Sequence, residues 1–113
     1  MEAVKQYEIW WAALPAPAGR RPVLLLSRDS AYAYLNKFAV AEITTSIRNI
    51  AVEVQLGRAE GMPNRCVANF DNLRTVSRAA LKRRAGTLSP QRHVEIKRAL
   101  GRALAWDELI DAE

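Results

Sequence analysis

The sequence predicts a mainly β fold, in which a small, strongly bent sheet or barrel is joined to a short helix and a C-terminal helix. Several short runs of apolar, β-branched and aromatic residues, separated by turn residues, occupy the chain as far as Ser77. Beyond Ser77 the composition shifts to Ala, Leu, Lys and Arg, which favour helix. The 113 residues can bury one compact core but not two. We therefore expect a single domain over residues 1–113.

The first two predicted strands flank a proline-rich turn. Residues 7–14 are aromatic and β-branched, as strands are, and the two prolines that follow prevent this strand from continuing. Residues 23–26 form a continuous apolar run of strand length. The polar residues 27–30 end the second strand and should begin a short helical stretch that reaches Leu35.

The next two predicted strands are residues 38–44 and 52–56. Successive side chains of a strand point to opposite faces, so Glu42 and Thr44 should share one face of the first. Residues 52–56 alternate between apolar and polar side chains, which is the pattern of a half-buried strand. The glycine, proline and asparagine of residues 57–64 then predict a loop.

Residues 66–68 and 73–76 predict two further short strands, after which the β region should end. Ser77 has the side chain of a helix cap and should begin a short helical turn through Lys82, with Gly86 closing the segment.

The C-terminal helix should begin at Ser89 and Pro90, because serine caps a helix and proline fits its first turn. One apolar stripe of this helix should pack on the sheet. The stripe consists of Ile96, Leu100, Ala103 and Leu104. The acidic residues 107–113 should form a frayed tail.

Composition limits the partners and the kinds of site. The net charge of +5 and the pI near 9.9 favour an anionic partner, nucleic acid or an acidic protein, although a basic surface also serves solubility. Cys66 and His93 are the only cysteine and histidine, which excludes a Cys/His zinc cluster or a disulfide within one chain. Residues 1–6 lack a signal-peptide pattern and no apolar run is long enough for a membrane span. We expect a cytoplasmic protein that does not bind membranes.

Arginine side chains precede the second strand. Arg20 and Arg21 lead into Pro22, which biases Arg21 to an extended backbone, so a loop or strand edge should present its guanidinium. A guanidinium can bind two oxygens of one phosphate. The alternative is an arginine that is solvated or paired with a loop carboxylate.

Two more polar groups end or begin strands. Thr44, Thr45 and Ser46 place three hydroxyls in succession, where they can donate to a phosphate or merely to backbone in a turn. Asp71, Asn72 and Arg74 form a second group, in which Asp71 can orient a guanidinium or cap a turn.

Basic residues crowd the C-terminal third and could bind a phosphate backbone or an acidic peptide, or could simply be the solvated face of a helix. They are Arg74, Arg78, Lys82, Arg83, Arg84, Arg92, Lys97, Arg98 and Arg102. Trp10 and Trp11 should point to opposite faces of their strand, so that one is in the core and the other can stack on a base or contact a dimer partner. The helical spacing of His93 favours a packing or capping role over catalysis.

Five segments, in this order, resemble the MazF/PemK (Kid) toxins of prokaryotic toxin–antitoxin systems. They are Tyr7-Glu8-Ile9-Trp10, the Arg21-Pro22-Val23-Leu24-Leu25-Leu26-Ser27 run, Ile43-Thr44-Thr45-Ser46, Asp71-Asn72-Leu73-Arg74-Thr75-Val76, and residues 81–104. The resemblance implies an SH3-like β-barrel of the CcdB/Kid/MazF type and a homodimer. It also implies metal-independent, sequence-selective cleavage of single-stranded RNA, such as mRNA, to 2′,3′-cyclic phosphate and 5′-OH ends. No cofactor is implied, and a cognate antitoxin would block the RNA site.

The resemblance also assigns roles to residues. Arg21 matches the family's catalytic arginine and Thr44 its catalytic threonine, with Thr45 as a further hydroxyl near the phosphate. Asp71 matches an acidic residue that some members use, and we infer a supporting role for Arg74. The loop over residues 14–20 is shorter than in many members, in which it often gates the active site and touches RNA.

The proton acceptor is not assigned by the resemblance, because arginine and threonine are poor bases. The candidates are Asp71, Glu42 and a water, and Glu42 is attractive because it shares the strand face of Thr44. The alternatives to a ribonuclease are a non-catalytic relative that binds nucleic acid or a protein such as gyrase, and a degenerate toxin that only binds an antitoxin.

Overall fold

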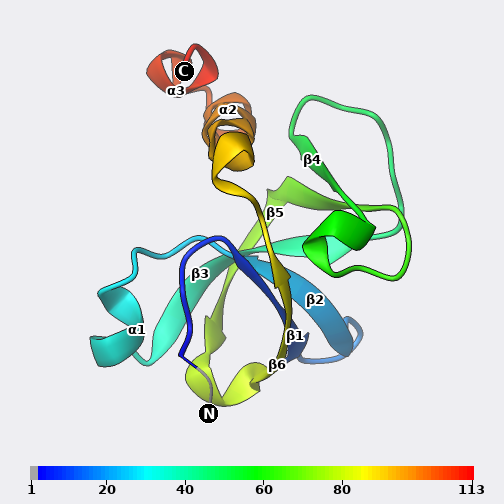
Figure 1. Cartoon of the computed structure of the whole chain (residues 1–113), viewed down its shortest axis with the longest axis vertical. Coiled ribbons are helices and arrows are strands. Elements are labelled where there is room, and N and C mark those ends of the chain that lie inside the picture. Colours follow the sequence, from blue (N-terminus) through cyan, green and yellow to red (C-terminus); the bar gives the residue numbers. More distant parts are fainter. Residues whose placement is uncertain (1–2) are drawn as a thin grey trace.

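A computed structural model of the chain describes residues 3–113, so Met1 and Glu2, part of the N-terminal segment considered above, lie outside the described residues. Six antiparallel strands form one curled sheet in the order β4-β5-β3-β2-β1-β6 (Figure 1). The strands are β1 (Glu8–Ala13), β2 (Arg20–Leu25), β3 (Lys37–Thr44), β4 (Glu53–Leu56), β5 (Cys66–Ser77) and β6 (Leu81–Thr87). The predicted mainly β fold with a strongly bent sheet is confirmed.

Short helical elements join and flank the strands. The α-helices are α1 (Ala31–Tyr34), α2 (His93–Leu104) and α3 (Asp107–Ile110), and the 3-10 turns are η1 (Arg58–Glu60), η2 (Arg78–Ala80) and η3 (Pro90–Arg92). Helix α2 packs against β4 and β5 and covers the end of the sheet opposite α1 (Figure 1). Within residues 3–113 no helix combines the length and the apolar character that crossing a membrane requires.

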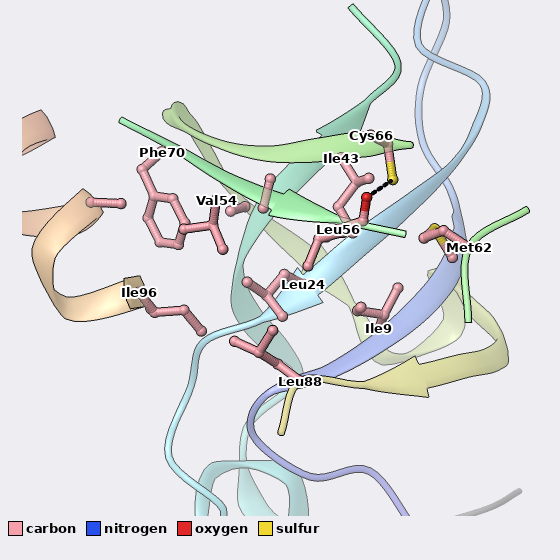
Figure 2. Close-up of a cluster of buried hydrophobic side chains, with 13 residues drawn as sticks. Ile9, Leu24, Ile43, Val54, Leu56, Met62, Cys66, Phe70, Leu88 and Ile96 are labelled. Atoms are coloured by element: carbon pink, nitrogen blue, oxygen red, sulfur yellow. Dashed lines mark hydrogen bonds between the residues drawn. The ribbon is translucent and has the colours of Figure 1, made fainter. Parts of the chain in front are cut away.

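The sheet is buried on both faces over β1, β2 and β3. Ile9 and Leu24 belong to a core cluster on one face, whereas Trp10, Val23 and Leu25 belong to a cluster on the other. In the first cluster Ile96 points from α2 toward Leu24 and Leu88 (Figure 2). Burial on both faces explains why residues 23–26 are continuously apolar rather than alternating.

Strand β5 is one long strand, so the prediction of two short strands at 66–68 and 73–76 is wrong. Ala41 and Glu42 are consecutive on β3, but their partners Leu73 and Asn69 on β5 are four residues apart. The extra residues form a bulge, which bends the strand and lets it continue to Ser77.

The helical prediction after Ser77 is right for η2 and wrong beyond it. The Ser77 hydroxyl accepts a hydrogen bond from the Ala80 backbone N–H, as a cap does. The chain then forms β6 and pairs with β1, because this pairing satisfies its backbone and overrides the helix-favouring composition. Gly86 does not close a helix. A Cβ there would overlap the carbonyl oxygen of Glu60, so only glycine permits β6 to approach η1 this closely.

Helix α2 follows the predicted start, since Pro90 opens η3 and the helix continues from His93. Ile96 is buried and Leu100 and Ala103 pack on the core as predicted, but Leu104 is exposed. The residues after 106 are not a frayed tail as expected. Asp107–Ile110 form α3, which packs on α2 at Gly101, where a Cβ would be 2.8 Å from the Leu109 Cβ.

Candidate active site

A pocket of about 290 Å³ lies where β1, β2, the end of β3 and the loop before β5 meet. It brings together Arg20, Arg21, Thr44 and Thr45, four of the residues singled out from the sequence. The remaining lining residues are Trp11, Pro22, Ile43, Met62, Pro63, Asn64 and Cys66. The other four predicted site residues do not line it; these are Glu42, Ser46, Asp71 and Arg74.

Strand pairing brings Arg21 and Thr44 to one end of the sheet. Strands β2 and β3 pair antiparallel, and their paired segment ends at Val23 and Glu42. Arg21 lies two residues before Val23, and Thr44 lies two residues after Glu42. The two residues, which are far apart in the sequence, therefore both line the pocket at this end of the β2–β3 pair.

The Thr44 hydroxyl is oriented by the turn that follows β3. Its Oγ1 accepts a hydrogen bond of 3.1 Å from the backbone N–H of Ser46. A hydroxyl has one donor and two acceptor lone pairs, so its proton remains for a pocket ligand. Ser46 is exposed and contributes its backbone at this point rather than its own hydroxyl.

Glu42 lies between two arginines beside the pocket. Its Oε2 is 3.1 Å from Nη1 of Arg74, and its Oε1 is 3.8 Å from Nε of Arg21. The second distance is an ion pair but too long for a hydrogen bond, and the buried Arg21 Nε has no hydrogen-bond partner among residues 3–113. The side chains of Arg21 and Arg74 are about one-third exposed and that of Glu42 one-fifth. The carboxylate thus holds both guanidinium groups near the pocket without lining it.

Trp11 and Arg20 form one wall of the pocket. The Arg20 guanidinium lies over the Trp11 indole, 5.2 Å from the ring centroid, which is a cation–π distance. Trp10 is buried and donates from Nε1 to Glu8. The predicted separation of the two tryptophans is therefore confirmed, with Trp10 in the core and Trp11 at the pocket.

A family model described as the PemK-like, MazF-like toxin of type II toxin–antitoxin systems matches residues 5–104. The chain belongs to this family. The toxin is 43% identical over 94 residues to the probable endoribonuclease MazF5 of Mycobacterium tuberculosis, covering 82% of this chain and 85% of the relative. It is 39% identical over 90 residues to the probable endoribonuclease MazF2 of the same organism, covering 79% and 86%.

Solved structures agree with this assignment. The Mycobacterium tuberculosis toxin MazF-mt6 matches with a TM-score of 0.81 and 32% identity, over 87% of this chain and 96% of that chain. An endoribonuclease in complex with its cognate antitoxin, from a mycobacterial species, matches with a TM-score of 0.79 over 92% of this chain and 97% of that chain. That second protein is 22% identical and shows the fold alone. The small β-barrel fold predicted from the resemblance is confirmed.

The loop after η1 forms the opposite wall of the toxin's pocket. The sequence predicted a loop there but no role for it in the site. Gly61, with φ +89°, packs its backbone against Ala85 of β6, and Met62, Pro63 and Asn64 follow it into the pocket. Cys66 completes this wall, and burial raises the pKa of its thiol, so it remains an unreactive lining group. The one available sequence signal was the glycine at position 61, directly before a proline-containing turn.

Asp71 and His93 stand apart from the pocket. Asp71 is an exposed residue of the β5 bulge, where its backbone N–H donates to the Asn69 side chain. His93 stacks on Tyr7 with ring centroids 3.5 Å apart, and its Nε2 lies 3.1 Å from the Leu88 carbonyl oxygen. The packing role predicted for His93 is confirmed.

Several basic residues of the C-terminal third have partners within the fold. Arg78 donates to the carbonyl oxygens of Tyr32 and Leu35, and Arg84 pairs with Glu8. Arg92 binds Glu95 and Glu60. The side chains of Arg78, Arg84 and Arg92 therefore take part in contacts within the fold.

Proposed function

We propose that the toxin is a metal-independent endoribonuclease that cuts single-stranded RNA at selected sequences and leaves 2′,3′-cyclic phosphate and 5′-OH ends. The observation that carries this proposal is the pocket in which a guanidinium and a strand-end hydroxyl, from Arg21 and Thr44, come together. Two relatives that are 39% and 43% identical are named probable endoribonucleases, which supports the same activity here.

In the proposed reaction, the ribose O2′ attacks the adjacent phosphorus. An O2′–P bond forms and the P–O5′ bond breaks. Negative charge builds on the non-bridging oxygens, and the Arg21 guanidinium offers two parallel N–H donors to them. The Thr44 and Thr45 hydroxyls, which also line the pocket, add further donors. The O2′ proton goes to a water, and the leaving O5′ takes a proton from water.

Water is the proton acceptor that the geometry favours among the three candidates. Both oxygens of Glu42 face arginine nitrogens, and Glu42 does not line the pocket. Asp71 is exposed and also lies outside the lining. We assign Glu42 and Arg74 as positioning residues, which fix the Arg21 side chain at the phosphate site.

A Glu42→Gln variant separates positioning from base catalysis. We expect kcat to fall by about 10–100-fold with little change in KM, because the Arg21 guanidinium is no longer held by a charged partner. The pH dependence of kcat should keep the wild-type shape, and Glu42→Asp should recover part of the rate. Loss of the acidic limb of the pH–rate profile in Glu42→Gln would instead identify Glu42 as the base.

The proposed partners are single-stranded RNA, a cognate antitoxin protein and a second copy of the chain, in the cytoplasm. A basic protein suits an RNA substrate and an antitoxin that carries acidic residues. Large hydrophobic side chains that remain exposed on residues 3–113 supply area for protein contacts. They are Tyr34, Leu35, Ile50, Leu73, Leu104 and Trp106.

The proposed activity is tested with purified toxin, EDTA and a mixed pool of single-stranded RNA whose new ends are sequenced. We expect cuts at a defined sequence, 2′,3′-cyclic phosphate on one fragment and 5′-OH on the other. A Thr44→Val variant, which keeps the shape of the side chain and removes the hydroxyl, should cut about 10²-fold more slowly. A requirement for a divalent metal would contradict the chemistry. Intact RNA together with salt-sensitive binding would favour the non-catalytic alternative.

A further inference from the structure

A second, larger and more open pocket adjoins the candidate active site on the far side of Trp11. Its volume is about 580 Å³. We call it the flanking groove and define it by its lining residues, Trp11, Arg58, Gly61, Met62, Pro63 and Arg83. Trp11, Met62 and Pro63 line both the flanking groove and the candidate active site. The two pockets are therefore parts of one continuous surface.

The strand register explains this continuity. On β1, Trp11 is directly opposite Pro22 of β2 and Arg83 of β6. Directly opposite residues present their side chains on one face. The row from Pro22 through Trp11 to Arg83 thus crosses three strands, a span of about 10 Å at the usual strand spacing. Because Trp11 and Pro22 of this row also line the candidate active site, a ligand bound there can extend along the row.

The flanking groove combines two available cations with apolar and aromatic surface. The side chains of Arg58 and Arg83 are exposed, and within the described part of the chain neither guanidinium forms an ion pair or a hydrogen bond. The next residue on β6, Arg84, is instead paired with the buried Glu8 at 3.1 Å. Trp11, Met62 and Pro63 lie between the two guanidinium groups and the active site, where an apolar face suits a base.

We propose that the flanking groove binds a nucleotide next to the scissile phosphodiester, with Arg58 and Arg83 on its phosphate and the apolar surface of Trp11, Met62 and Pro63 against its base. This inference rests on the proposed endoribonuclease function. Aromatic side chains interleaved with cations are the usual means of binding single-stranded RNA. Continuity with the Arg21 and Thr44 pocket favours RNA over an acidic peptide as the occupant. The groove would make KM depend on the nucleotides beside the cut, while the chemical step stays with Arg21 and Thr44.

The test uses short RNAs that contain the mapped cleavage sequence, and an Arg58→Ala/Arg83→Ala double variant of the full chain. The double variant should raise KM at least tenfold and leave kcat within twofold. The slope of log KM against log salt should fall by about 0.7 for each arginine removed. A wild-type substrate with a neutral methylphosphonate in place of the flanking phosphate should show the same rise in KM. In the double variant, that replacement should leave KM unchanged.

Arg102→Ala is the matched control, since it removes one cation from the exposed surface of α2, outside both pockets. It should keep the wild-type KM apart from a small general effect of charge. If the double variant loses no more affinity than this control, the flanking groove does not bind RNA. If it keeps RNA cleavage but loses affinity for the purified cognate antitoxin, the groove is a protein site and the inference is overturned.

The two proposals can fail separately. Wild-type toxin that binds RNA without cutting it, with binding lost in the double variant, would support the groove and contradict the endoribonuclease function. If the wild type cleaves RNA and the double variant has an unchanged KM, the endoribonuclease function is supported and the role of the groove is contradicted. Absence of both cleavage and binding in the wild type would overturn both.

Discussion

An Arg21→Ala toxin loses RNA cleavage, with kcat lowered by about 10³-fold, while the protein remains folded. One preorganised donor to a developing oxyanion is worth about 10²–10³ in rate, and an arginine at a phosphoryl centre up to about 10⁵. Arg21 reaches the pocket from the start of β2, and Thr44 reaches it from the end of β3. Arg20 also lines the pocket, but its guanidinium lies over the Trp11 ring.

The folded state should tolerate this change. The Arg21 side chain is one-third exposed, and its Nε is 3.8 Å from a Glu42 carboxylate that Arg74 still neutralises at 3.1 Å. We expect the free energy of unfolding to change by less than about 1 kcal/mol. Single-turnover cleavage of the mapped substrate and a thermal melt measure the two effects. Arg21→Lys is the matched control, because it keeps the charge and loses the paired donors. More than a tenth of the wild-type rate in Arg21→Ala would remove Arg21 from catalysis.

The residues that bring chemistry to the pocket could be predicted because they sit at strand ends. Pro22 holds Arg21 extended, and the hydroxyls of Thr44 and Thr45 follow an apolar strand. The assignment of catalytic roles needed the resemblance as well. Which residues face each other, however, depends on register. The Glu42–Arg74 pair joins residues 32 positions apart in the chain, and only the pairing of β3 with β5 brings them together.

The parts that could not be predicted depend on tertiary contacts. The composition of residues 81–87 favours helix, yet they form β6 because β1 offers an unpaired edge. Met62 and Pro63 belong to a segment for which the sequence predicts only a loop. They reach the pocket because Gly61 lets η1 pack on β6. The single strand β5 was missed because a bulge hides the alternation of buried and exposed positions.

An Arg92→Ala toxin loses about 2–3 kcal/mol of folding free energy, which is the largest stability effect that we expect from one surface-accessible side chain. Arg92 joins three elements. It donates from Nε and Nη2 to Glu95 at 2.8 and 2.7 Å, and from Nη2 to the Gln55 carbonyl oxygen of β4 at 2.6 Å. Its Nη1 is 3.2 Å from Glu60, whose side chain is only 10% exposed. Alanine would leave that buried carboxylate without its cation.

The Arg92→Ala change should also lower activity, because Glu60 helps to shape the loop that forms one wall of the pocket. Glu60 directly precedes Gly61, and its side chain accepts a 2.7 Å hydrogen bond from the Gly57 N–H. Urea unfolding measures the loss of stability. The value of kcat, at a temperature where both proteins are folded, measures the effect of the altered pocket-wall loop on catalysis. Arg98→Ala is the control on the adjoining helix α2, because among residues 3–113 the Arg98 side chain donates only to the Ala112 carbonyl, at 2.9 Å, and its loss should cost about 1 kcal/mol. Equal losses in the two variants would contradict a special role for Arg92.

The ion pair between Arg92 and Glu95 predicts that the free energy of unfolding depends on pH, and it fixes the direction of that dependence. The hydrogen bond from Arg92 lowers the pKa of Glu95 below its ordinary value of 4.5, and burial opposes this in part. Because the folded-state pKa is the lower one, the unfolded chain binds more protons between the two values, and stability rises with pH there. The contribution of Glu95 is therefore fully present above the unfolded-state pKa and is lost as the pH falls through the folded-state pKa. The free energies of unfolding of wild type and Glu95→Gln, measured with urea, should differ by a constant amount at neutral pH and converge as the pH falls through the lowered folded-state pKa of Glu95. In Arg92→Ala only the weaker attraction of Arg98 still lowers the pKa of Glu95, so the effect of the Glu95→Gln change should be much smaller, and an effect of wild-type size would contradict the role of Arg92.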